Sequence, residues 1–72
     1  MIINLYDAIE TIVDIDTKGR EIPGLFIPKG TRGVVVEIYK IDGQNEYLVD
    51  LDSETFTKNQ ICQLRESEIK KI

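Results

Sequence analysis

The segment Pro28-Lys29-Gly30-Thr31-Arg32-Gly33-Val34-Val35-Val36-Glu37-Ile38-Tyr39 carries the strongest strand signal in this 72-residue chain. A turn rich in proline and glycine precedes a run of β-branched residues that ends in an aromatic, as is typical of β-strands. We predict a strand over residues 33–40, and Gly33 is expected to allow a close backbone approach or a β-bulge. The apolar residues expected to face the core are Val34, Val36 and Ile38.

The chain before this strand divides into a first strand and a long loop. Residues 8–15 are rich in β-formers, and one alternating set is the expected core face: Ile9, Thr11, Val13 and Ile15. Residues 16–30 hold three glycines and both prolines, which excludes a regular helix or a central strand. The loop also contains Leu25-Phe26-Ile27, which would gain nothing from full exposure. We expect Phe26 or Ile27 to fold back over the core, with an apolar contact patch for a partner as the alternative.

The chain after this strand supplies further antiparallel partners. A hairpin is predicted at Ile41-Asp42-Gly43-Gln44-Asn45, where Asp42-Gly43 suits positive φ angles. Residues 46–51 then return as a strand with Tyr47, Val49 and Leu51 facing inward. A short strand over 55–57 with Phe56 inward, a 3₁₀ turn over 58–61 and a last strand over 62–64 follow. The pattern predicts an all-β domain of five short strands over residues 1–65. Residues 66–72 are expected to form a short tail, frayed into a helical turn or disordered.

Composition bounds the possible functions. The chain has one cysteine, Cys62, and no histidine, so an internal disulfide, a Ser-His or Cys-His catalytic pair and the usual zinc sites are excluded. Cys62 lies in an expected strand and is interpreted as a core residue. No basic leader or long apolar run occurs, so a cytoplasmic protein is expected. We predict a non-enzymatic protein with no catalytic residues, no metal site and no cofactor.

Acidic residues gather on and beside the expected hairpin. Asp50, Asp52 and Glu54 are spaced two apart, but the glycine and the final glutamate of a calcium-binding EF-hand loop are missing. Together with Glu37 and Glu46 they predict a negatively charged surface. We expect this surface, with Leu25-Phe26-Ile27, to bind another protein that presents a basic surface.

Basic residues gather in the long loop with the turn that follows it and in the tail, and only Lys40 and Lys58 lie among the acidic residues between them. The segment from Lys29 to Gly33 combines glycines, a hydroxyl and cations, but a P-loop requires a following helix, and here a strand follows. A nucleic-acid partner is disfavoured because the strands are acidic, and the cations available for it are few: Lys18, Arg20, Lys29 and Arg32. An exposed edge strand leaves a homodimer open.

The order of expected elements resembles the SH3-like small barrel, in which a long loop separates the first two strands and a 3₁₀ turn precedes the last. More narrowly, Tyr6-Asp7-Ala8-Ile9, the segment from Pro28 to Tyr39 and Glu46-Tyr47-Leu48-Val49-Asp50-Leu51 are similar to an uncharacterised bacterial family of small SH3-like proteins. The similarity extends from Tyr6 to Leu64. It departs at the short turn Asp52-Ser53-Glu54 and in the enlarged first loop.

The resemblance implies a function only by association. Members of that family often neighbour toxin-like genes, which implies an antitoxin or immunity role. An accessory subunit docking on a larger enzyme is the alternative, and the Lys-Gly-x-x-Gly-x-Val turn is also similar to KOW-type nucleic-acid-binding barrels. The family brings no established functional residues to this chain, so the site expectation rests on the acidic and apolar residues named above.

Overall fold

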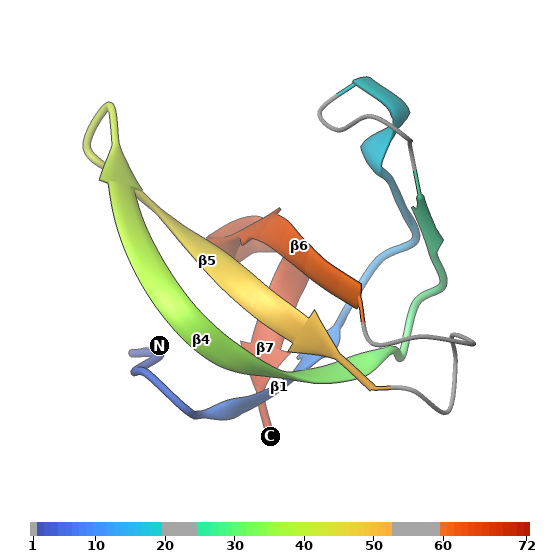
Figure 1. Ribbon diagram of the computed structural model, residues 1–72, viewed down its shortest axis with the longest axis horizontal. Helices are drawn as coiled ribbons and strands as arrows, with labels where there is room; N and C mark the ends of the chain where they lie inside the picture. Colours follow the sequence, from blue (N-terminus) through green and yellow to red (C-terminus); the bar gives the residue numbers. More distant parts are fainter. Residues whose placement is uncertain (1, 20–24, 53–59) are drawn as a thin grey trace.

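A five-stranded antiparallel sheet organises the computed structural model, which describes residues 2–19, 25–52 and 60–72 (Figure 1). The strand order is β6-β5-β4-β1-β7. The strands are β1 (Ala8–Thr11), β4 (Arg32–Ile41), β5 (Gln44–Leu51), β6 (Gln60–Arg65) and β7 (Ile69–Lys71). A second, two-stranded sheet pairs β2 (Ile15–Asp16) with β3 (Phe26–Ile27). The predicted all-β class is therefore confirmed, and the described residues form seven strands, five of them in the main sheet.

Two short 3₁₀ helices complete the described part of the chain, η1 (Thr17–Gly19) and η2 (Glu66–Glu68), and no α-helix occurs within it. The predicted closure into a barrel is not observed. Strands β6 and β7 lie at opposite edges of the sheet and do not pair with each other in the described residues. The sheet is strongly curved but stays open, and Figure 1 shows β1 and β7 behind β4 and β5.

The inward face of β4 differs from the prediction. Val35 is fully buried, whereas Val34 is 40% exposed. The register slips between Val35 and Glu37, where two β4 residues oppose one on β5, so the alternation changes phase at Val36. Ile38, beyond this bulge, packs against the core as expected. Of the two roles expected for Gly33, the close backbone approach is confirmed, since an added Cβ would lie 2.7 Å from the Asp50 carbonyl oxygen. The bulge lies three residues later.

Local turn chemistry produces the hairpin between β4 and β5. Ile41 pairs with Gln44, and the two residues between them, Asp42 and Gly43, have φ angles of 51° and 79°. Positive φ at both positions is the requirement of a type I′ turn, which matches the twist of the strands. The predicted hairpin is confirmed, with a shorter loop than the expected residues 41–45 because β5 already begins at Gln44. Tyr47, Val49 and Leu51 are buried as predicted.

The C-terminal residues are part of the sheet and not a separate tail. β7 runs antiparallel to β1, with Lys71 opposite Ile9 and Ile69 opposite Thr11. Ile69 is 1% exposed and completes the core. The 3₁₀ turn before the last strand is η2 and not residues 58–61, because residues 60 and 61 already belong to β6. The strand predicted over 55–57 lies outside the described residues.

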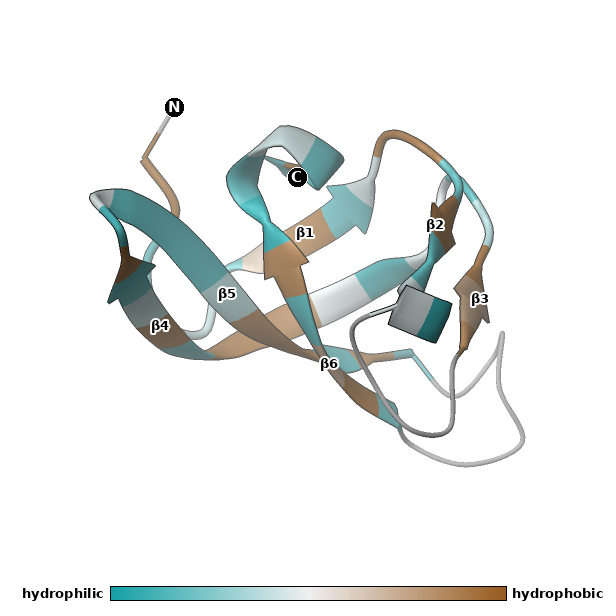
Figure 2. Cartoon of the chain, turned by 90° about the horizontal axis from the view of Figure 1, so that it is seen from above, coloured by the Kyte–Doolittle hydropathy of each residue, from teal (hydrophilic) through white to brown (hydrophobic). Residues whose placement is uncertain are grey.

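The core lies between the two halves of the curved sheet and is capped by the β2–β3 ribbon. Ile9, Thr11 and Ile15 are buried as predicted, whereas Val13 is exposed in the bend between β1 and β2. Cys62 is 1% exposed, which confirms its interpretation as a core residue. Ile27 packs its side chain into the same core. Figure 2 shows β2 and β3 side by side, with β3 hydrophobic and β2 half hydrophobic and half hydrophilic.

Candidate functional site

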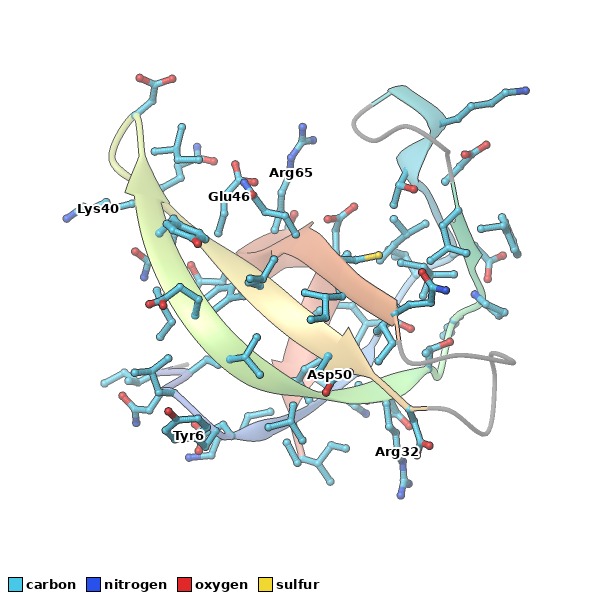
Figure 3. All side chains as sticks on the ribbon, in the orientation of Figure 1. Tyr6, Arg32, Lys40, Glu46, Asp50 and Arg65 are labelled. Carbon is cyan, nitrogen blue, oxygen red and sulfur yellow. The ribbon has the colours of Figure 1, made fainter. Side chains whose placement is uncertain are left out.

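The outward-facing side chains of β4, β5 and β6 form three rows across the sheet, which we call the outer face. Because opposite residues in antiparallel strands project from the same side, the pairing defines each row. The rows are Val34, Asp50 and Ile61; Glu37, Leu48 and Gln63; and Tyr39, Glu46 and Arg65. Figure 3 shows Asp50 near the end of β5 that lies away from the hairpin, and Glu46 beside Arg65 nearer to the hairpin.

The outer face is partly apolar. Ile61 is 56% exposed, Tyr39 is 44% exposed and Val34 is 40% exposed. Sequence reasoning missed Val34 and Ile61, the first because the bulge reverses the phase of β4, the second because it was placed in a turn. Their identification needs the strand pairing, since no local pattern distinguishes them from core residues.

Three of the predicted acidic residues lie on this face. Glu37, Glu46 and Asp50 project from the same side of the sheet but belong to different rows. On β5, Leu48 lies between Glu46 and Asp50 on this side. Glu46 accepts a hydrogen bond of 3.0 Å from Gln63 Nε2. The Asp50 carboxylate, in contrast, has no hydrogen-bond or ion-pair partner within residues 2–19, 25–52 and 60–72.

The other predicted site residues have different positions. Asp52 directly follows β5, and its N–H donates to the carbonyl of Arg32. Ile27 is fully buried and belongs to the core, Leu25 packs partly against it, and Phe26 is exposed on the β2–β3 ribbon. The structure thus does not bring Leu25-Phe26-Ile27 together as one exposed patch. Glu54 lies outside the described residues.

A charged row borders the outer face at the other end of β4. Glu10 on β1 lies between Arg32 on β4 and Lys70 on β7, because it is opposite both in the register. Its carboxylate oxygens are 3.6 Å from Arg32 Nε and 3.4 Å from Lys70 Nζ. Arg32 is therefore already engaged with an acidic partner. Of the other loop cations, Lys18 and Lys29 are exposed and Arg20 is not described.

A shallow hollow of about 480 Å³ lies where β1, β4 and β5 run side by side. A small residue makes it possible, since the methyl side chain of Ala8 leaves room opposite Val34, and Gly33 lines the hollow next to them. Asp50 and Ile72 stand at its sides. The described residues that line it are Ala8, Arg32, Gly33, Val34, Asp50, Leu51, Asp52 and Ile72. A second hollow of about 490 Å³ lies beside the hairpin, between β4, β5 and η2.

The turn before β4 does not offer free amides to a phosphate. The N–H of Lys29 donates to Asp14 Oδ1 at 2.7 Å, and the N–H of Gly30 donates to the Thr11 carbonyl at 2.9 Å. The N–H of Thr31 donates to Thr11 Oγ1 at 3.0 Å. The Thr31 hydroxyl is committed as well, because it donates to the Pro28 carbonyl at 2.6 Å. These bonds fix the turn as a structural element.

We searched the described part of the chain for metal-binding groups and for buried polar atoms without partners. No group of three or more Cys, Asp or Glu side chains in these residues could hold a metal ion. Every buried side-chain nitrogen and oxygen within the same ranges has a hydrogen-bond partner. No described helix is long and apolar enough to cross a membrane.

One carboxyl group is perturbed, at the start of β1. The N–H of Asn4 donates to Asp7 Oδ2 at 2.8 Å, and Lys71 Nζ lies 3.4 Å from the same oxygen. The hydrogen bond from Asn4 and the charge of Lys71 hold the pKa of Asp7 below its usual 3.8, against the opposing effect of burial. This carboxylate joins the two ends of the chain and is a structural group.

Comparison with known proteins finds no matching family model, no matching curated protein and no matching solved structure.

Proposed function

We propose that this chain is a non-enzymatic protein-binding module that uses its outer face. The observation that supports the proposal is that exposed apolar side chains and acidic side chains share this one face of the sheet. Val34, Tyr39 and Ile61 would lose solvent contact against a partner, which is favourable by about 25 cal/mol for each Å² of apolar surface. A sheet face that alternates apolar and charged side chains suits a macromolecule better than a small substrate.

The net negative charge of the outer face indicates which class of partner it binds. Glu37, Glu46 and Asp50 give the outer face three negative charges, against one positive charge from Arg65. Complementary charge speeds the encounter with a basic protein surface and raises the cost of binding an acidic one. A protein with a basic surface is therefore the expected partner.

For the fold and the biological role, we propose an opened relative of the SH3-like small barrel that acts in the cytoplasm as an antitoxin or immunity partner. The described strand order supports this, because residues 12–31 separate β1 from β4 and η2 precedes the last strand, β7. The role itself rests on the resemblance to the bacterial family named above. An accessory subunit of a larger enzyme would use the same face and would differ only in its partner.

The proposal is tested with two variants of the outer face. The partner is first isolated from the native host with the wild-type chain and purified. Its association with Glu37→Lys and with Tyr39→Ala is then measured by surface plasmon resonance over a range of salt concentrations. We expect slower association for Glu37→Lys, with a weaker dependence on salt, and faster dissociation for Tyr39→Ala.

A matched control separates the face from overall charge. Glu66→Lys makes the same charge change on η2, off the sheet, at an exposed position, and it should associate nearly as the wild type does. Equal kinetics for Glu37→Lys, Tyr39→Ala and the wild type would overturn the proposed face. Co-expression with the toxic product of a neighbouring gene tests the antitoxin role. The wild-type chain should rescue cell growth, and the double variant Glu37→Lys/Tyr39→Ala should not.

A further inference from the structure

We infer that the hollow between β1, β4 and β5 receives one arginine or lysine side chain from the partner protein. Its aliphatic stem would lie against Val34 and Ile72, and its charged head would bind the Asp50 carboxylate. This inference rests on the proposed function, because it names the chemistry that the partner must present at one point of the outer face.

The first support is the state of Asp50. This residue is partly buried on β5, directly between Val34 on β4 and Ile61 on β6. Its carboxylate has no partner in the described chain. Covering such a group with an apolar surface would remove its hydration without replacement, at a cost of several kcal/mol for an ion. An apolar partner surface would therefore bind weakly at this point, and a partner that supplies a cation would bind more tightly.

The second support is that neighbouring cations are already engaged elsewhere. Arg32 also lines the hollow, but its Nε lies 3.6 Å from Glu10 Oε1. Lys70 lies 3.4 Å from the other oxygen of the same carboxylate. The row Arg32, Glu10 and Lys70 is thus an ion-paired unit of its own. Within the described residues this unit makes no ion pair with Asp50, which leaves that charge to be neutralised from outside.

The third support is the shape and chemistry of the hollow. Its volume of about 480 Å³ gives room for one long side chain. Ala8, Gly33, Val34 and Ile72 contribute apolar surface next to the carboxylate. Arginine and lysine combine an apolar stem with a charged head, and they bury the stem along apolar surface while the head finds its counter-charge.

The inference is tested with small probes that mimic the side chain. ¹⁵N-labelled protein is titrated with n-butylguanidinium, and amide chemical shifts are followed by NMR. We expect saturable shifts centred on Gly33, Val34, Asp50 and Leu51. Guanidinium lacks the stem and n-butylurea lacks the charge, so each loses one of the two contacts. Each should bind at least about tenfold more weakly than n-butylguanidinium.

Two isosteric variants assign the binding to Asp50. Asp50→Asn removes the charge and keeps the shape, and it should weaken n-butylguanidinium binding about tenfold. Glu37→Gln removes a carboxylate from the next row of the same face, and it should leave this binding unchanged. Shifts that spread over the whole surface, or equal affinity in Asp50→Asn and the wild type, would overturn the inference.

The same variants separate this inference from the proposed function. If Glu37→Lys and Tyr39→Ala weaken partner binding and Asp50→Asn does not, the outer face binds the partner but the cation site is wrong. If n-butylguanidinium binds at Asp50 and no outer-face variant affects the partner, the proposed function is wrong. Shifts at the hollow that depend on protein concentration without probe, with a dimer in sedimentation, would assign the hollow to a second copy and overturn the inference.

Discussion

Among single residues, Gly33 determines how closely β4 and β5 approach each other. A Cβ atom at this position would lie 2.6 Å from Val49 Cγ1 and 2.7 Å from the carbonyl oxygen of Asp50. The side chain could adjust, but the carbonyl oxygen belongs to the paired backbone and cannot move without breaking the register.

Gly33→Ala should therefore destabilise the protein by about 1–3 kcal/mol, the usual cost of overpacking a filled site. Gly19→Ala is the matched control, because no atom lies within 4 Å of its added Cβ. That variant should be neutral or stabilised by at most about 1 kcal/mol. Urea denaturation measures both changes. Equal midpoints for the two variants would show that β4 and β5 can separate without cost.

Asp7 predicts a pH dependence of stability at the acid end. Because its folded-state pKa lies below the usual 3.8, the ionised carboxylate stabilises the fold above that pH. This contribution is lost as the pH falls below 3.8 and through the lower folded-state value. Asp7→Asn should thus be less stable than the wild type at neutral pH, and the difference should shrink in strongly acidic solution.

Lys71→Met provides the control for that measurement. It removes the attraction of Lys71 but keeps the hydrogen bond from Asn4, the larger cause of the lowered pKa. Thermal unfolding from neutral to strongly acidic pH should retain most of the acid dependence in Lys71→Met and lose it in Asp7→Asn. A parallel decline of the wild type and Asp7→Asn would contradict the assigned role of this carboxylate.

Elements were predictable where short-range patterns determine them. The Asp42-Gly43 hairpin follows from backbone preference alone, and the alternation of β5 correctly places Tyr47, Val49 and Leu51 inside. The same alternation places Glu46 and Asp50 outside, so the acidic part of the outer face was predictable. In both cases the information lies within a few neighbouring residues.

Elements that depend on distant partners were not predictable. The run Val34-Val35-Val36 has no alternation, so the position of the bulge depends on β5 and not on β4 itself. Strand β7 has only three residues, too few for a period, and it forms because β1 offers a free edge and the core needs Ile69. The apolar part of the outer face was missed for the same reason, since it depends on which strands lie side by side.

The role of β7 gives a prediction for this element. Ile69→Ala should destabilise the protein by about 2–5 kcal/mol, the cost of emptying a buried isoleucine site. Ile72→Ala makes the same chemical change at a residue that is 58% exposed, and it should change stability by less than about 0.5 kcal/mol. Urea denaturation distinguishes them, and similar midpoints would mean that the last strand does not contribute to the core.

For the whole molecule, the pairing of β1 with β7 joins the two ends of the chain. Ile9 is opposite Lys71, and the side chains of Asp7 and Lys71 interact across the same pair. The radius of gyration is 11.2 Å, close to the value of about 11 Å expected for a globular domain of this length. The fold therefore requires the pairing of residues 69–71 with β1.

A chain truncated after Arg65 should consequently fail to fold. A domain of 72 residues has a total stability of about 4–11 kcal/mol, and loss of Ile69 alone removes about 2–5 kcal/mol of it. Loss of the pairing with β1 adds to this. A chain truncated after Lys71 is the control and should remain folded. ¹⁵N NMR spectra report the outcome, and well-dispersed signals from residues 1–65 would contradict the prediction.

The burial of Cys62 on an edge strand has a practical consequence. It is the only thiol in the sequence, and it is shielded on the inner side of β6. A thiol-specific reagent can therefore react only when β6 opens, and the labelling rate under native conditions counts these openings. If the opening free energy equals the global stability, β6 detaches only with the whole fold. If the opening free energy is smaller than the global stability, β6 detaches while the rest of the fold stays intact. A partner bound to the outer face would then slow the labelling of Cys62.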